Sequence, residues 1–156
     1  MSEEFFVARR ARRTAVIRLA APVAQVFPLF GPLGERAWAG EDWQPTMLHP
    51  VPGADAEGMV FTTAHADHTT GVWVNLRFDA AAGIAEYVVL EPEMRVTEIS
   101  IHLQAESREQ TTARVTYTWT GLSARGNEEV ALQEARFSGW LAEWEARINA
   151  VLAATP

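Results

Sequence analysis

The chain has 156 residues, of which 48% are hydrophobic, and a net charge of −7 at pH 7, so it suits one domain with a single core. The acidic balance argues against sequence-independent nucleic-acid binding, which relies on clustered cations. The absence of cysteine excludes disulfides, thiolate nucleophiles, iron–sulfur clusters and cysteine-type zinc sites. All 13 basic residues are arginine, and without lysine the chain has neither Schiff-base chemistry nor a Walker-type phosphate loop.

The N-terminal residues carry a basic run after an acidic start. We interpret residues 1–12 as an extension or the start of a first strand, followed by a single domain at 13–152 and a tail at 153–156. The run is Arg9, Arg10, Arg12 and Arg13. It is read as a solvated terminus or an exposed strand edge, with a nucleic-acid or partner arm as the alternative. No membrane-spanning apolar run or signal-peptide core is found, so a cytoplasmic protein is expected.

A strand and two short helices are predicted next. Thr14–Leu19 suits a strand, and Ala21-Pro22 opens a short helix, because proline is tolerated in a first helical turn. The apolar face of that helix contains Val23, Val26, Phe27 and Phe30. A second short helix is expected around residues 33–38, before Gly40.

From residue 44 to 122 the pattern changes to strands joined by short turns, which favour antiparallel neighbours. The expected strands are 45–50, 58–65, 70–79, 84–90, 95–105 and 111–122. In the last, Ala113, Val115, Tyr117 and Trp119 alternate with polar residues, which indicates one covered and one solvated face. Either face of strand 84–90 could point inward.

Residues 128–152 carry the clearest helical pattern. Asn127 is the expected N-cap, with Glu128 and Glu129 near the positive end of the helix dipole. The apolar face contains Phe137, Trp140, Leu141, Trp144, Ile148, Val151 and Leu152. A helix of this length extends about 38 Å, enough to cross a sheet. Gly139 costs about 1 kcal/mol relative to alanine, and we interpret it either as room for a ligand or as close packing.

This order of elements resembles the helix-grip fold of the START and Bet v 1-like superfamily, also described as SRPBCC or polyketide cyclase/dehydrase-like. The similar stretches are VIRLAAPVAQVFPLF, GERAWAGEDWQP, GMVFTT, EPEMRVTEISIHL, TARVTYTWTGLSARG and WLAEWEARINAVL. The resemblance implies an α+β fold: a curved antiparallel sheet of six to seven strands grips a long C-terminal helix, and two short helices follow the first strand. A bent sheet cannot contact a straight helix along its whole length, so a cavity is expected between them.

The resemblance also implies that the cavity holds a small hydrophobic or aromatic molecule, and we predict its binding or transport. A polyketide cyclase- or dehydratase-like enzyme and a chaperone-activator-like interaction module are the alternatives. The expected ligand-binding residues are Trp38, Trp43, Phe61, Tyr87, Tyr117, Trp119, Phe137, Leu141 and Trp144. No catalytic residue is assigned, because the superfamily has no common catalytic residue, and neither a metal nor a cofactor is expected. Neither nucleic acid nor a membrane span is expected, and a homodimer is left open.

Two polar groups of residues give weaker signals. His65, Asp67 and His68 are of metal-ligating types, but they fall at a predicted hairpin tip, where exposed turn residues are the usual interpretation. Glu86 and Glu98 interrupt apolar strands. Either would be a general base if it faced the cavity, but exposed ion pairing is the expected role, and the apolar alternation of residues 95–103 places Glu98 outside.

The remaining candidates are two tryptophans and two arginines. Trp38 and Trp43 lie in a loop-like stretch rich in glycine and proline, and they either form the cavity rim or seal the core. Arg77 and Arg114 are expected on the solvated side of the sheet. An inward orientation would instead provide an anchor for a carboxylate or phosphate.

Overall fold

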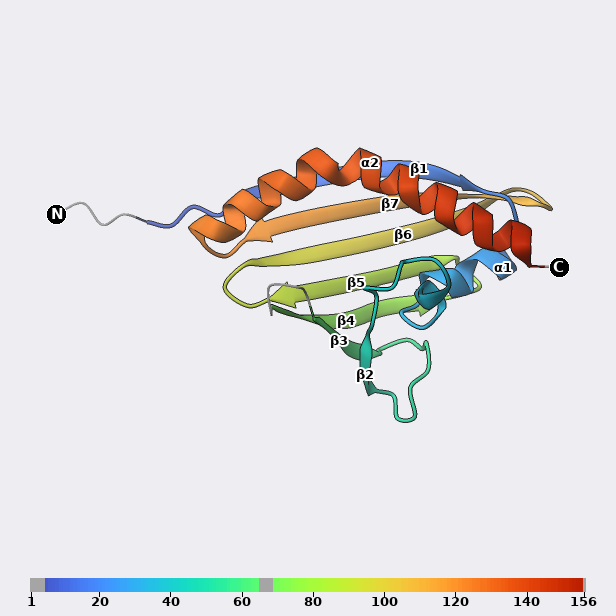
Figure 1. The fold of residues 1–156 in the computed structure, drawn as a ribbon, viewed down its shortest axis with the longest axis horizontal. Coiled ribbons are helices and arrows are strands. Elements are labelled where there is room, and N and C mark those ends of the chain that lie inside the picture. Colours follow the sequence, from blue (N-terminus) through green and yellow to red (C-terminus); the bar gives the residue numbers. More distant parts are fainter. Residues whose placement is uncertain (1–4, 65–68, 156) are drawn as a thin grey trace.

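Within residues 5–64 and 69–155, which the computed structural model describes, seven antiparallel strands form one sheet and a long helix covers one side of it (Figure 1). The spatial order is β1-β7-β6-β5-β4-β3-β2. The strands are β1 (Arg10–Leu19), β2 (Thr46–His49), β3 (Val60–Ala64), β4 (Thr70–Asp79), β5 (Ile84–Glu91), β6 (Arg95–Ser107) and β7 (Gln110–Gly121). The helices are α1 (Val23–Val26), η1 (Phe27–Phe30), η2 (Gly34–Ala37) and α2 (Ala124–Ala154).

This architecture confirms the predicted α+β helix-grip fold, with short helical segments after the first strand and a long helix at the end of the chain. The apolar residues of the first helical region are used as expected, since Val26, Phe27 and Phe30 are buried. None of the helices in the described ranges is both long and apolar enough to cross a membrane.

The long helix lies along β1 and β7 and touches β6 much less (Figure 1). Its polar side chains bind the free edge of β1. The backbone N–H of Arg18 donates to Glu145 at 3.0 Å, and that of Ala20 donates to Asn149 Oδ1 at 2.9 Å. Asn149 Nδ2 in turn donates to the carbonyl of Arg18 at 2.9 Å. These bonds satisfy an edge that would otherwise be open to further strand pairing, and they hold α2 at the side of the sheet.

The inner face of the sheet follows the predicted alternation. In β7, Ala113, Val115, Tyr117 and Trp119 are buried, and in β6 Ile99 and Ile101 are buried. The open question about residues 84–90 is resolved, because Ala85, Tyr87 and Val89 are the buried residues of β5.

The four charged strand residues singled out in the sequence lie on the opposite face. Glu86 alternates with the buried residues of β5, and Glu98 is exposed and pairs with Arg10 at 3.2 Å. Arg77 is exposed and pairs with Asp79 at 3.3 Å, and Arg114 is also exposed. The solvated placement expected for Glu98, Arg77 and Arg114 is therefore confirmed, whereas Glu86 lies on the same face but is half-buried.

The helix α2 begins at Ala124 rather than at residue 128, and the predicted cap was wrong. Ser123 is the N-cap, since its hydroxyl accepts a hydrogen bond from the backbone N–H of Gly126 at 3.0 Å. Asn127 instead binds the segment before β1: its side chain accepts from the N–H of Arg9 at 2.8 Å and donates to the carbonyl of Val7 at 3.0 Å. The sequence pattern missed this because an asparagine beside acidic residues is equally typical of a cap.

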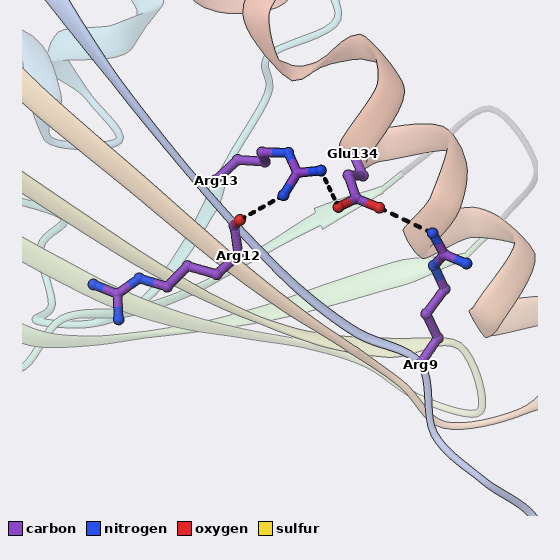
Figure 2. Close-up of polar contacts among 4 residues, drawn as sticks. All are labelled: Arg9, Arg12, Arg13 and Glu134. Atoms are coloured by element: carbon purple, nitrogen blue, oxygen red, sulfur yellow. Dashed lines mark hydrogen bonds and ion pairs between the residues drawn. The ribbon is translucent and has the colours of Figure 1, made fainter.

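The first strand begins at Arg10, before the Thr14–Leu19 pattern, so the end of segment 1–12 is the start of this strand, one of the two roles expected for it. The strand extends this far because Arg10 to Arg13 pair with Thr120 to Tyr117 of β7. Figure 2 shows that Arg9 and Arg13 both reach the carboxylate of Glu134 on α2. The Arg9 Nη2 to Glu134 Oε1 distance is 2.9 Å. Arg13 also donates to the carbonyl of Arg12 at 3.0 Å. The basic run is thus part of an exposed edge strand that is tied to α2. This agrees with its interpretation as an exposed strand edge.

Both interpretations of Gly139 were wrong. The residue is exposed, and a Cβ added there would meet no atom within 4 Å, so it neither makes room for a ligand nor permits close packing. Gly126, in the first turn of the same helix, is different. A Cβ at that position would collide with the backbone carbonyl of Met94, so only glycine lets the helix approach the turn between β5 and β6.

We expect Gly139→Ala to raise the free energy of unfolding by about 1 kcal/mol, because alanine restricts the unfolded chain and favours the helix. The same change at Gly126 is expected to lower it by about 1–3 kcal/mol, because the added methyl group displaces backbone. Urea unfolding followed by circular dichroism measures both values. Equal effects at the two positions would contradict this account of the helix.

Candidate functional site

A cavity of about 460 Å³ lies between α2, the inner face of β4 to β7 and the chain around η2. This volume falls in the range typical of small-ligand sites. Every tryptophan and both tyrosines of the chain border it, whereas none of the seven phenylalanines does. The aromatic lining residues are Trp38, Trp43, Trp73, Tyr87, Tyr117, Trp119, Trp140 and Trp144.

The rings pack mainly edge to face, the arrangement that aromatic quadrupoles favour. On the helix side, the Trp144 ring centroid lies 5.2 Å from that of Trp38 and 6.0 Å from that of Trp140. Trp140 also contacts Tyr117 of β7, at 4.9 Å. Towards β3, Trp43 and Trp73 lie 5.5 Å apart. The cavity wall is therefore a connected aromatic surface contributed by both the sheet and the helix.

The nine residues predicted from the sequence fall into two sets. The residues that border the cavity are Trp38, Trp43, Tyr87, Tyr117, Trp119 and Trp144. The other three, Phe61, Phe137 and Leu141, are buried behind it. Phe61 stacks on Trp73 at 5.2 Å, and Phe137 packs against Tyr117 at 5.6 Å, so these two residues support the wall. A ligand-binding role for the nine stays a prediction.

Trp38 and Trp43 form part of the wall and also fasten the segment that carries them. The indole N–H of Trp38 donates to the carbonyl of Leu29, and that of Trp43 donates to the carbonyl of Pro32, both at 2.8 Å. Trp38 is only 6% exposed. The two interpretations of these rings are therefore compatible, because each ring seals the core on one side and borders the cavity on the other.

Glu35 is a cavity residue that the sequence analysis missed. It lies on η2, and Asp55 from the β2–β3 connection positions this short helix by accepting the backbone N–H groups of Leu33 and Gly34 at 3.0 and 3.1 Å. Burial raises the pKa of Glu35 well above its ordinary value, and the charge of Asp55 raises it further. The carboxyl group is thereby favoured in its uncharged form.

Tyr117 lies within electrostatic reach of two ionisable groups of the cavity, Glu35 and Arg95. Burial is the main cause that raises the pKa of its hydroxyl; Glu35 raises this pKa further and Arg95 lowers it. Burial likewise raises the pKa of Tyr87, with a further contribution from Glu35. The Tyr87 hydroxyl donates to the carbonyl of Phe30 at 2.7 Å, which fixes this ring between the sheet and η1.

An ion pair between Glu91 and Arg95 forms another polar part of the lining. The Arg95 Nε to Glu91 Oε2 distance is 2.8 Å, and Arg95 Nη2 donates to Glu91 Oε1 at 3.3 Å. The two side chains are only 15% and 11% exposed. The pair spans the end of β5 and the start of β6, where the sequence pattern indicated only a turn.

Among the lining residues not predicted from the sequence, Trp140 could have been found from its spacing, whereas Trp73, Glu35 and Arg95 could not. Trp140 lies on the predicted apolar helix face and precedes Trp144 by one helical turn, so the helical period placed both rings on one surface. Trp73 pairs with Phe61 across β3 and β4, and this register could not be read from the sequence. Glu35 and Arg95 had no signal of their own, since isolated charges near turns are usually solvated.

The structure also bears on metal binding. Across residues 5–64 and 69–155, no three His, Asp or Glu side chains gather as a metal site would require. The candidates His65, Asp67 and His68 lie outside the described residues.

The arrangement of residues at the cavity is suited to holding a flat, mostly apolar molecule against aromatic rings, with Glu35 available to donate or accept a proton.

Comparison with solved structures identifies the fold. Norcoclaurine synthase from Thalictrum flavum, in complex with dopamine and hydroxybenzaldehyde, is similar over 99% of both chains, with a TM-score of 0.68 and 10% identity. A protein from Rhizobium leguminosarum covers 93% of this chain and 99% of its own, with a TM-score of 0.58 and 18% identity. For the allergen Ara h 8.0201 the shares are 94% and 99%, with a TM-score of 0.58 and 12% identity.

The chain has the Bet v 1-like fold. At these identities the likeness establishes the arrangement of the backbone and assigns no activity to individual residues. No protein family matches the sequence, and no curated protein matches it either. The function of the Bet v 1-like cavity in this chain therefore has to be argued from its own residues.

We expect Glu35→Gln to remove a pH dependence of stability. Because folding raises the pKa of Glu35, the unfolded chain releases this proton at a lower pH than the folded chain does. The Glu35 contribution to stability is therefore complete below the ordinary glutamate pKa of about 4.3 and is lost as the pH rises through the folded value. Relative to Glu35→Gln, the native protein should lose unfolding free energy from pH 4 to 8 in urea titrations. Parallel curves for the two proteins would contradict the assignment.

Proposed function

We propose that this chain binds a small, largely aromatic molecule in the cavity beneath α2. The observation that carries the proposal is that every tryptophan and tyrosine, and no phenylalanine, borders the cavity. A space filled only for stability would suit phenylalanine and leucine equally well. Tryptophan and tyrosine add polar edges that can orient a bound molecule, and such a mixture of apolar area with a few polar groups is typical of ligand sites.

The fold comparison supports the same ligand class. The similar norcoclaurine synthase structure contains dopamine and hydroxybenzaldehyde, which are small molecules with one aromatic ring each. Molecules of this size fit a volume of about 460 Å³. The proposal for this chain concerns the chemical class, a compact aromatic compound, and does not extend to those two molecules. The cytoplasmic location, the absence of nucleic-acid binding and the homodimer option stay predictions.

An acid–base enzyme of the cyclase or dehydratase kind is the second candidate, and Glu35 is the observation that favours it. Its carboxyl group borders the cavity, and burial raises its pKa towards the range in which one group can both take up and release a proton. The hydroxyl of Tyr117 is close enough for Glu35 to influence its pKa. Glu35 would remove a proton beside a carbonyl of the bound molecule and return one to the product.

The binding proposal predicts that phenylnaphthylamine, an uncharged aromatic fluorophore, binds to one saturable site. Val89→Phe should weaken this binding by about tenfold or more, because the added ring occupies the cavity. The matched control is Val88→Phe, the same change at the next residue of β5, which faces away from the cavity. Fluorescence titration measures the affinities, and circular dichroism checks that both variants fold. Equal affinities for the two folded variants would refute binding in this cavity.

The enzyme candidate predicts that the protein accelerates the exchange of the benzylic hydrogens of phenylacetone with D2O. Nuclear magnetic resonance follows this exchange directly. Acceleration should increase with pH as Glu35 loses its proton, and Glu35→Gln should abolish it while keeping affinity for phenylnaphthylamine. Native-like exchange in the Glu35→Gln variant would remove Glu35 from the proposed chemistry and leave the binding proposal intact.

A further inference from the structure

One buried polar atom at the cavity has no partner within the described residues. Arg95 Nη2 donates to Glu91, and Nε lies 2.8 Å from the same carboxylate as an ion pair without hydrogen-bond geometry. The Nη1 atom is buried with neither a hydrogen bond nor an ion pair to any described group. A guanidinium cannot lose its proton in a protein. Leaving such a donor unpaired away from water is unfavourable, and buried polar atoms without partners are rare in native proteins. An acceptor is therefore required at this position.

The position of Arg95 shows which end of the cavity needs the acceptor. Its neighbour Met94 accepts the N–H of Leu122 at 2.8 Å, and Gly126 packs on the same carbonyl. Arg95 is thus at the end of the cavity beside the first turn of α2. The opposite end is beside the last turns, where Arg147 donates to the carbonyl of Ala39 at 3.3 Å. The lining residues of α2 extend from Gln133 to Arg147, about 21 Å of helix.

The charges of Glu91 and Arg95 determine whether an anionic or an uncharged acceptor is favoured at Nη1. The Glu91 carboxylate lies against the guanidinium of Arg95 and neutralises it, so an anionic ligand group would gain little from Arg95 and would be repelled by Glu91. An uncharged carbonyl oxygen needs only a donor, and Nη1 is one. Such an oxygen also carries no charge that must be removed from water on entering the cavity.

We propose that Arg95 is a ligand-binding residue whose Nη1 donates to an uncharged carbonyl oxygen of the bound aromatic molecule. This inference rests on the proposed binding function and narrows its ligand class to aromatic ketones, aldehydes, esters or amides. The carbonyl lies at the end beside the first turn of α2, and the rings of the molecule lie among Trp140, Trp144 and Tyr117. Glu91 acts as a positioning residue, since it holds the guanidinium and excludes anions.

The test compares four fluorophores that differ in one group each. Prodan is an uncharged naphthyl ketone, and its propyl analogue, 2-dimethylamino-6-propylnaphthalene, is the same molecule with the carbonyl replaced by a methylene group. Anilinonaphthalene sulfonate is an anion, and phenylnaphthylamine is its uncharged parent. The native protein should bind prodan about tenfold more tightly than the propyl analogue, the effect of one hydrogen bond to a charged donor. It should bind the sulfonate no more tightly than its parent.

Two variants separate the donor from the carboxylate. The double variant Glu91→Gln with Arg95→Met leaves no unpaired buried charge, and it should lose the preference for prodan. Glu91→Gln alone keeps the donor, so the preference for prodan should remain while affinity for the sulfonate rises by about tenfold, because the guanidinium charge is no longer balanced. The control Arg114→Met, on the outer face of β7, should match the native protein with all four probes.

Several results of these titrations would overturn the assignment of Arg95 as a ligand-binding residue. A double variant that keeps the tenfold prodan preference, or a native protein that prefers the sulfonate, overturns the assignment of Arg95. Binding of prodan and its propyl analogue with equal affinity also overturns it, but leaves the aromatic-binding function standing. Failure of all four probes to bind overturns both. If the double variant does not fold, the infrared carbonyl band of prodan bound to the native protein is measured instead. A hydrogen bond lowers the frequency of this band. An unshifted band would therefore refute the hydrogen bond from Arg95 to the carbonyl.

Discussion

The interaction on which the rest of this structure depends is the attachment of α2 to the free edge of β1. Side chains from the start, middle and end of the helix bind the edge: Asn127 bonds before the strand, Glu134 pairs with two arginines, and Asn149 bonds at its end. A helix held by an edge cannot also lie over the centre of a curved sheet. The concave face of β4 to β6 is therefore covered by the chain around η2 and by long side chains, and a cavity remains.

Large aromatic side chains cover much of this concave face. They extend far from the backbone at little entropic cost, and they brace one another edge to face across the space. The gap is too wide for the rings to fill, and the few polar groups within it are constrained. Glu35 is favoured in its uncharged form, Glu91 and Arg95 neutralise each other, and Tyr87 is bonded to the backbone. The cavity thus has little net charge although the whole chain is acidic.

The periodic elements could be predicted from the sequence, because burial imposes a regular pattern on them. The alternation around Tyr117 and the helical repeat around Trp144 gave the correct faces, and their order along the chain indicated the fold. Features that depend on a meeting of distant segments could not be predicted. Asn127 does not cap the helix because its side chain binds the chain before β1, and Glu35 lies at the cavity on a short helix that Asp55 fixes. Both contacts join segments that are far apart in the sequence, so the residues next to Asn127 and Glu35 do not indicate them.

The exclusive placement of tryptophan at the cavity has an optical consequence. No indole is located elsewhere in the chain, so the whole near-ultraviolet emission of the protein originates from this wall. Centroid separations of 5.2 and 6.0 Å between neighbouring indoles also permit efficient transfer of excitation from ring to ring. A single bound molecule that quenches one indole would thereby reduce the emission of several. The intrinsic fluorescence of the unlabelled protein therefore reports whether the cavity is occupied.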